Sequence, residues 1–219
     1  MIDLNELSFF GTGIACLFAL TVAIQLGYYL IVFLRFARFN PSEQNLENNE
    51  PVSVIIAAHN EDFNLEKNMP FIFEQDYPNF EVVIVNHAST DDTHHVLNDF
   101  SRSHKNLKVV NIDEDLNFFK GKKFPLSIGI KSASHEILLL TDADCKPESN
   151  QWIKQMVSNY DANTEIILGY GPYSKGESFL NKIIRYDTFM IALQYFSFAI
   201  CKLPYMGVGR NLSYRKSLF

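Results

Sequence analysis

The chain has 219 residues, enough for one substantial domain and a smaller appendage. Its net charge of −6 and its lack of a basic block argue against a non-specific nucleic-acid binder. Three widely spaced cysteines, Cys16, Cys145 and Cys201, fit neither a disulfide framework nor a zinc site and suit a reducing compartment.

The first predicted element is a membrane-spanning helix. Residues 9–34 contain no charge, and as a helix they would extend about 39 Å, more than the roughly 30 Å of a hydrocarbon core. Arg35 and Arg38 follow the run, so the positive-inside rule predicts an external N-terminus and a cytoplasmic remainder. The run is too long for a signal peptide and lacks its basic start. We expect an anchor in the inner (cytoplasmic) membrane.

A polar linker should separate this anchor from a folded domain. Residues 39–50, FNPSEQNLENNE, combine a proline with several asparagines, which is typical of a linker. We therefore expect an anchor at residues 1–38, a linker at 39–50 and a folded domain at 51–219.

The folded domain alternates predicted strands with predicted helices. Apolar, β-branched runs predict strands at residues 52–58, 80–85, 107–112, 136–140 and 165–168. Predicted helices lie at residues 62–75, 91–102, 122–133 and 152–160. Pro70 should kink or split the first of these helices. The alternation predicts an α/β fold with a mostly parallel sheet and helices on both faces.

Residues 178–202 form a long, mostly apolar helical pattern. Its uncharged core, residues 188–200, is too short to span a bilayer. A core helix and an interfacial helix both remain possible interpretations.

Ligands of parallel sheets bind beyond the carboxyl ends of the strands, where three polar segments should converge. Residues 59–61 follow the first strand, residues 86–89 the second and residues 142–144 the fourth. Asp142 and Asp144 point to the same side of an extended chain, and such a pair favours Mg²⁺ or Mn²⁺ holding a diphosphate. A solvated acidic turn is the alternative.

Two basic segments are further candidates. Lys122 lies in the KGKK sequence at the start of a predicted helix, where a cation is unfavourable unless it faces an anion such as phosphate. The alternative is a solvated basic turn. Residues 207–216 are glycine-rich and basic, and either line the site as an irregular loop or form a surface connection.

Four segments, taken together and in order, resemble family-2 glycosyltransferases of the GT-A (Rossmann-like) fold. They are PVSVIIAAHNE, QDYPNFEVVIVNHASTDDT, KGKKFPLSIGIKSASHEILLLTDADC and GVGRNLSYRKSLF, and the resemblance covers residues 51–219. The anchor suits the membrane-bound branch of that family. The resemblance implies inverting, metal-dependent transfer of a sugar from a nucleotide-sugar, a UDP-sugar by default, to a lipid or glycan acceptor at the membrane.

The resemblance also assigns roles to residues of this sequence. Those expected to hold the nucleoside are Ala57, His59, Glu61, Asn86 and His87. Lys122 should approach the nucleotide or its phosphates, Asp142 the ribose or the metal, and Asp144 should ligate the divalent cation. The donor-sugar and acceptor side should be lined by Gly209, Arg210 and Asn211.

Two features depart from the family pattern. Asn86 and His87 stand where the family usually has paired aspartates, which removes negative charge and leaves the base open. The family's general base is a carboxylate downstream of the segment that matches residues 207–216, whereas no acidic residue follows Asp187 here. Asp187 lies in the helical pattern and is a poor candidate. We expect the base beyond Phe219 and a truncated chain that transfers sugar poorly.

Two other functions stay open. A nucleotidyltransferase could use the same aspartate pair, but it would want a glycine-rich phosphate loop, and AAHNED has no glycine. A degenerate, nucleotide-binding membrane protein without transferase activity would fit the Asn86-His87 pair and the early end of the sequence.

Overall fold

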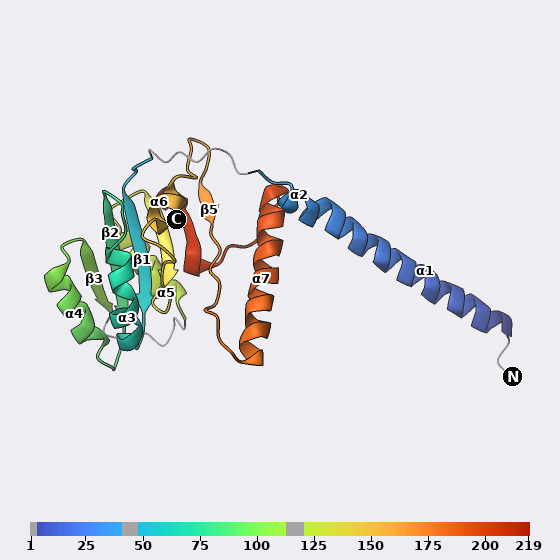
Figure 1. Ribbon diagram of the computed structural model, residues 1–219, viewed down its shortest axis with the longest axis horizontal. Helices are drawn as coiled ribbons and strands as arrows, with labels where there is room; N and C mark the ends of the chain where they lie inside the picture. The colour runs from blue at the N-terminus through green and yellow to red at the C-terminus, as the bar shows by residue number, and fades with distance from the viewer. Residues whose placement is uncertain (1–3, 41–47, 113–120) are drawn as a thin grey trace. The chain divides into compact units, whose positions relative to one another are not determined.

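The computed structural model describes residues 4–40, 48–112 and 121–219 (Figure 1). Part of the expected linker and Lys120 of the KGKK sequence lie outside these residues. The chain divides into two compact units. Residues 1–41 and 172–206 form a helical unit, and residues 42–171 and 207–219 form a sheet unit.

The sheet unit contains one six-stranded sheet in the order β3-β2-β1-β4-β6-β5. Its four parallel strands are β1 (Val52–Ala58), β2 (Phe80–His87), β3 (Leu107–Ile112) and β4 (Ile137–Asp142). The short strand β6 (Leu212–Arg215) runs antiparallel to both β4 and β5 (Ile166–Leu168). The predicted α/β class with a mostly parallel sheet is confirmed.

Helices cover both faces of this sheet. On one face α3 (Asp62–Phe73), α4 (Thr93–Ser103) and α6 (Trp152–Val157) pack on the strands through buried side chains, including Met69, Leu97 and Ile153. On the other face α5 (Lys123–Ser132) packs through Ile130 against Ile55 of β1 and Val83 of β2. Alternation along each strand explains this, because successive side chains point to opposite faces.

The structure differs from two local predictions in part. The helix α3 is not split at Pro70, which lies in its last turn. The missing N–H of Pro70 removes a single hydrogen bond, to the Glu66 carbonyl one turn earlier, and the helix continues to Phe73. Residues 207–216 are also more regular than expected, because a 3-10 turn, η2 (Gly209–Asn211), leads directly into β6. A second 3-10 turn, η3 (Lys216–Leu218), follows β6.

The helical unit consists of two long apolar stretches. The first comprises α1 (Leu4–Tyr28), the π-helical turn η1 (Tyr29–Phe33) and α2 (Leu34–Ala37). Within it Gly11–Ala37 is long and apolar enough to cross a membrane, and none of its most apolar window is buried. This agrees with the predicted anchor. The second stretch is α7 (Phe179–Ile200), which begins at the N-cap Ser178, whose side chain accepts a hydrogen bond from the Asn181 N–H.

Candidate functional site

The carboxyl ends of β1, β2 and β4 meet at one edge of the sheet. In the strand register Ala57 lies opposite Asp142, and Ala58 lies opposite Asn86. The three polar segments that follow these strands are therefore neighbours in space, as parallel pairing requires. The structure brings together the residues expected for the nucleoside and those expected for the metal.

Strand alternation divides these residues between the two faces of the sheet. Ala57, His87 and Asp142 follow Ile55, Val83 and Leu140 at even spacing, so they point toward the face covered by α5. The ring of His87 meets Phe124 of α5 edge-on, with 6.2 Å between ring centroids. Phe124 was missed by sequence reasoning, although it follows the KGKK segment directly.

Asn86 points to the opposite face. Its Nδ2 donates a hydrogen bond to Asn111 Oδ1 on β3, at 3.1 Å. These two adjacent residues therefore point to opposite faces of the sheet. Among the described residues, the buried atoms Asn86 Oδ1 and His87 Nε2 have no hydrogen-bond partner. Leaving such buried atoms without hydrogen bonds costs free energy, and a bound ligand would supply the missing hydrogen bonds.

Reciprocal hydrogen bonds join the loops that follow β1 and β2. The Asn60 N–H donates to Ser89 Oγ at 2.9 Å, and the Thr90 N–H donates to Asn60 Oδ1 at 2.7 Å. His59 Nδ1 lies 2.6 Å from the His87 carbonyl oxygen, which can only accept, so Nδ1 carries the proton. Asn60 has φ of 56°, a left-handed conformation that asparagine tolerates. The two loops therefore form one preorganised rim.

Glu61 is attached to the same rim. Its N–H donates to Thr93 Oγ1 at 2.9 Å, and its carboxylate accepts from Asn64 Nδ2 at 2.6 Å. This contact orients the Glu61 carboxylate at the start of α3.

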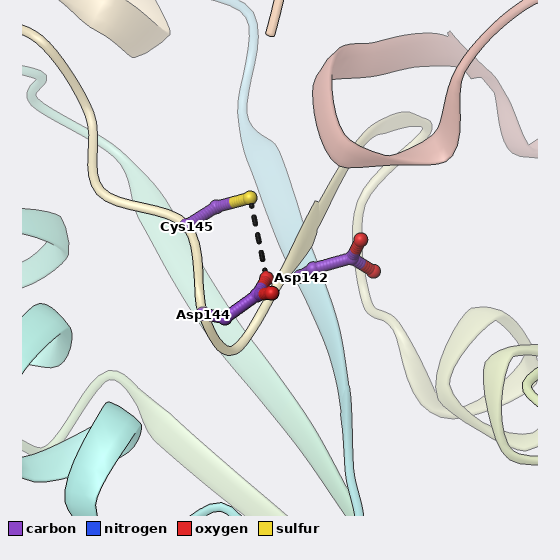
Figure 2. A group of neighbouring side chains, drawn as sticks. All are labelled: Asp142, Asp144 and Cys145. Carbon is purple, nitrogen blue, oxygen red and sulfur yellow. Dashed lines mark hydrogen bonds between the residues drawn. The ribbon is translucent and has the colours of Figure 1, made fainter. Parts of the chain in front are cut away.

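The two aspartates of the DAD sequence differ in their contacts. Asp142 Oδ1 forms an ion pair with Lys122 Nζ at 3.1 Å, whereas an Asp144 carboxylate oxygen accepts from the Cys145 thiol at 3.5 Å. Figure 2 shows Asp144 turned toward Cys145, with the Asp142 carboxylate projecting away from that pair in this view. One potential ligand atom from each of the three residues lies within 4.8 Å of the others.

Lys122 is electrostatically bound to this acidic cluster. Partial burial lowers its pKa, but the hydrogen bond to Asp142 and the charges of Asp142, Asp144 and Glu61 outweigh burial and raise the pKa above its ordinary value. Lys122 is also the N-cap residue of α5, where helix N–H groups favour an anion. A phosphate there would meet both the lysine and the helix N-terminus.

The donor set fits a hard divalent cation through its oxygen atoms. Burial, followed by the charges of Asp144 and Asp142, raises the pKa of Cys145 to about 11, so the thiol stays protonated. A protonated thiol is a poor ligand for Mg²⁺ or Mn²⁺, which take oxygen ligands. Asp142 and Asp144 are therefore the residues that could hold such an ion.

A buried amide fixes the turn between the aspartates. Asn68 of α3, which is 5% exposed, donates from Nδ2 to the Ala143 carbonyl oxygen at 3.0 Å. Sequence reasoning missed this residue. The available signal was a polar side chain among the inward-facing positions of α3 defined by Leu65, Met69 and Ile72.

The segment Gly209–Asn211 lies beside the same end of β4. Because Leu140 pairs with Leu212 in antiparallel register, the residues before Leu212 run past those after Leu140. The Asn211 side chain accepts from Trp152 Nε1 and donates to the Tyr170 carbonyl oxygen, both at 3.0 Å. Its amide thus holds the segment in place.

Three comparisons with known proteins give a consistent result. The sequence profile described as "Glycosyl transferase family 2" matches residues 53–219. Glycosyltransferase AglE of Haloferax volcanii is 32% identical over 120 residues, which are 54% of this chain and 38% of AglE. Poly-β-1,6-N-acetyl-D-glucosamine synthase of Staphylococcus epidermidis is 34% identical over 95 residues, 43% of this chain and 22% of the synthase.

A solved structure shows the same fold. It is the mannosyltransferase PcManGT of Pyrobaculum calidifontis in complex with GDP-Man and Mn²⁺, with a TM-score of 0.68 and 23% identity over 92% of this chain and 55% of that one. The present chain spans less than half the length of the curated relatives named above. The profile match covers most of the chain, and the protein therefore belongs to glycosyl transferase family 2.

Proposed function

We propose that the protein takes part in transfer of a sugar from a nucleotide-sugar donor to an acceptor at the membrane, with a divalent cation and with inversion at the anomeric carbon. The observation that carries the proposal is the Asp142–Asp144 pair at the carboxyl end of β4, facing Lys122 at the start of α5. Family membership supports the reaction class. Among similar solved structures, PcManGT is in complex with GDP-Man and Mn²⁺, and glucosyl-3-phosphoglycerate synthase of Mycobacterium tuberculosis is in complex with UDP.

The proposed roles follow from the arrangement of the side chains. Asp144 and Asp142 would hold Mg²⁺ or Mn²⁺, which supplies charge neutralisation for the leaving diphosphate. Lys122 would exchange its ion pair with Asp142 for a donor phosphate, because one ammonium group can satisfy either partner. Both interactions favour departure of the nucleoside diphosphate.

The nucleoside end of the donor would lie along the α5 face of the sheet edge. Ala57, His59, Glu61 and His87 form its proposed contacts, together with Phe124, which the sequence did not indicate. Asn86 would contact the nucleoside from the opposite face of the sheet, where its side-chain amide is hydrogen-bonded to Asn111 of β3. UDP remains the default nucleotide, and the Asn86-His87 pair leaves the identity of the base open.

The acceptor side would be formed by Gly209, Arg210 and Asn211, where the Trp152 contact fixes the segment beside β4. Asp187, the last acidic residue in the sequence, lies exposed on α7 and is not proposed as the general base. We place the catalytic unit at the cytoplasmic side of the inner membrane, tethered by Gly11–Ala37. The acceptor would be a membrane-associated lipid or glycan.

Calorimetry on the full chain in detergent, with UDP-, GDP- and ADP-sugars, tests this proposal. We expect one donor class to bind only with Mn²⁺ or Mg²⁺, and Asp144→Asn to abolish the metal-dependent part. Asp99→Asn is the matched control, because Asp99 is an exposed carboxylate of α4 that pairs only with nearby Arg102 among the described ion pairs. Binding that survives Asp144→Asn unchanged, or no metal-dependent binding to any donor, would refute the site.

Turnover separates the enzyme from a degenerate binding protein. Metal-dependent donor binding with slow donor hydrolysis or transfer supports the proposed reaction. Tight binding of the donor, with no detectable release of nucleoside diphosphate in the presence of any acceptor, would instead support the degenerate, nucleotide-binding alternative.

A further inference from the structure

The first half of α7 exposes an unusual amount of apolar surface. Its large exposed side chains include Phe179, Leu180, Ile183, Tyr186, Phe189 and Ile191. The exposed fractions reach 77% at Phe179 and 66% at Tyr186. Isolated exposed apolar residues are ordinary, but a contiguous set of this size marks an interaction surface.

Two basic residues on this half of the helix border its apolar face, as in helices that lie at a membrane interface. Lys182 and Arg185 are three residues apart and therefore neighbours on one side of the helix. At 100° per residue they lie toward one border of the apolar arc, beside Phe189, while Phe179 and Ile183 lie toward its middle. Basic residues that flank an apolar face with aromatic rings are typical of helices that lie on anionic membranes.

The same helix is unsuited to crossing the bilayer. Asp187 lies exposed within the apolar arc, and a carboxylate at the bilayer centre is expensive. Among the described residues, the one candidate span is Gly11–Ala37, and α7 is not among such spans. A depth at the headgroup boundary accommodates both the apolar side chains and this carboxylate.

The other end of α7 contacts the candidate span itself. The rings of Phe196 and Phe36 are stacked with 6.0 Å between centroids, and the rings of Phe198 and Tyr28 lie 5.8 Å apart. Arg35 lies next to Phe36, at the end of the span that the positive-inside rule places in the cytoplasm. The C-terminal half of α7 therefore lies against the end of the candidate span, so both helices belong to one unit at the same end of the anchor.

We propose that α7 is a second membrane contact of this protein, lying in the cytoplasmic interface with its exposed apolar face at the boundary between the lipid headgroups and the acyl chains. This inference rests on the membrane anchor in the proposed function. The partner is the bilayer surface, rather than a second copy of the chain or another protein segment.

Depth-dependent quenching on the full chain in nanodiscs tests the inference. Cys16, Cys145 and Cys201 are first replaced by serine, and an environment-sensitive fluorophore is attached at a new cysteine. Tyr186→Cys and Phe189→Cys report on α7. Leu20→Cys is the positive control on α1, and Asp99→Cys on α4 is the negative control.

We expect lipids brominated near the headgroup to quench the probes at 186 and 189 more strongly than lipids brominated near the chain ends. The probe at 20 should be quenched by at least one of the two lipids, and the probe at 99 by neither. Quenching at 20 without quenching at 186 and 189 would overturn the inference and leave the anchor intact. Loss of quenching at all positions would overturn the anchor as well. A blue shift at 189 without lipid quenching would indicate a protein partner and also overturn the inference.

Discussion

Gly129 is the point of closest approach between α5 and the sheet. A Cβ atom added to Gly129 would lie 2.8 Å from Ile55 Cγ2 and 3.1 Å from Val85 Cγ2. Ordinary van der Waals contacts begin at 3.4 Å, so the shorter of these distances is too short by about 0.6 Å. Gly129→Ala must therefore push α5 outward or displace two β-branched side chains of a densely packed core.

Two opposing effects set the size of the change. Alanine favours the helix over glycine by about 1 kcal/mol, while overpacking a core costs about 1–3 kcal/mol. We expect Gly129→Ala to lower the free energy of unfolding by about 1 kcal/mol. This corresponds to a fall in Tm of about 3 °C for a chain of this size. Gly129→Val should cost about 3 kcal/mol, because it adds two more methyl groups and loses helix propensity relative to alanine.

Trp152 provides the assay, since it is the single tryptophan of the sequence and lies in the sheet unit. Its fluorescence would be followed during thermal unfolding in detergent. Lys131 is an exposed residue of α5, so the difference in unfolding free energy between Lys131→Gly and Lys131→Ala measures helix propensity without a change in packing. If Gly129→Ala raises the free energy of unfolding by as much as alanine exceeds glycine at position 131, the added Cβ meets no steric resistance. That result would refute the predicted overpacking.

A functional effect should accompany the loss of stability. The helix α5 begins beside Lys122 and carries Phe124, so its displacement moves both away from Asp142 and His87. We expect Gly129→Val to weaken donor binding even at temperatures where the sheet unit remains folded.

The remaining predictions concern single side chains. Asn211→Ala should cost about 1–3 kcal/mol of unfolding free energy, because it leaves the Trp152 N–H without its acceptor, whereas Asn163→Ala on an exposed turn should cost almost nothing in the same fluorescence assay. Burial raises the pKa of Glu81, but hydrogen bonds from two serines outweigh it and hold the pKa below its ordinary value. Its stabilisation is therefore present at neutral pH and lost as the pH falls through the lowered pKa, so Glu81→Gln should flatten the acid limb of a stability profile measured from about pH 6 downward. Cys145 should react with iodoacetamide at pH 8 about 100-fold more slowly than free cysteine, because burial and then the Asp144 and Asp142 charges raise its pKa to about 11; mass spectrometry that finds comparable rates would contradict the described environment.

The sequence predicted the parts of the fold that local patterns specify. The strands β1 and β3 were located at their observed bounds because each is a compact run next to clear breaks. The convergence of residues after β1, β2 and β4 followed from parallel pairing alone. The strand β6 could not be found this way, because its buried member is Ser213. That serine is stabilised by contacts with Leu138 and Tyr160, which are distant in the chain.

The candidate site shows the same division. Asp142 and Asp144 stand out in the sequence because charges end an apolar strand. Asn68 and Trp152 act through partners 75 and 59 residues away, so no local pattern indicates their roles. The opposite directions of Asn86 and His87 could have been deduced, since strand alternation applies to any adjacent pair once β2 is extended to His87.

The position of β6 between β4 and β5 also has a consequence for the order of assembly. Among the described strands, β5 pairs with β6 and with no other strand, although it precedes β6 by more than forty residues. During synthesis β5 must therefore wait until α7 and the turn η2 have been made before it can join the sheet. Until then β4 presents an open edge, which is a template for unwanted pairing with other chains. Closing that edge late, through four residues, makes the completion of the sheet depend on the prior synthesis of the α7 segment.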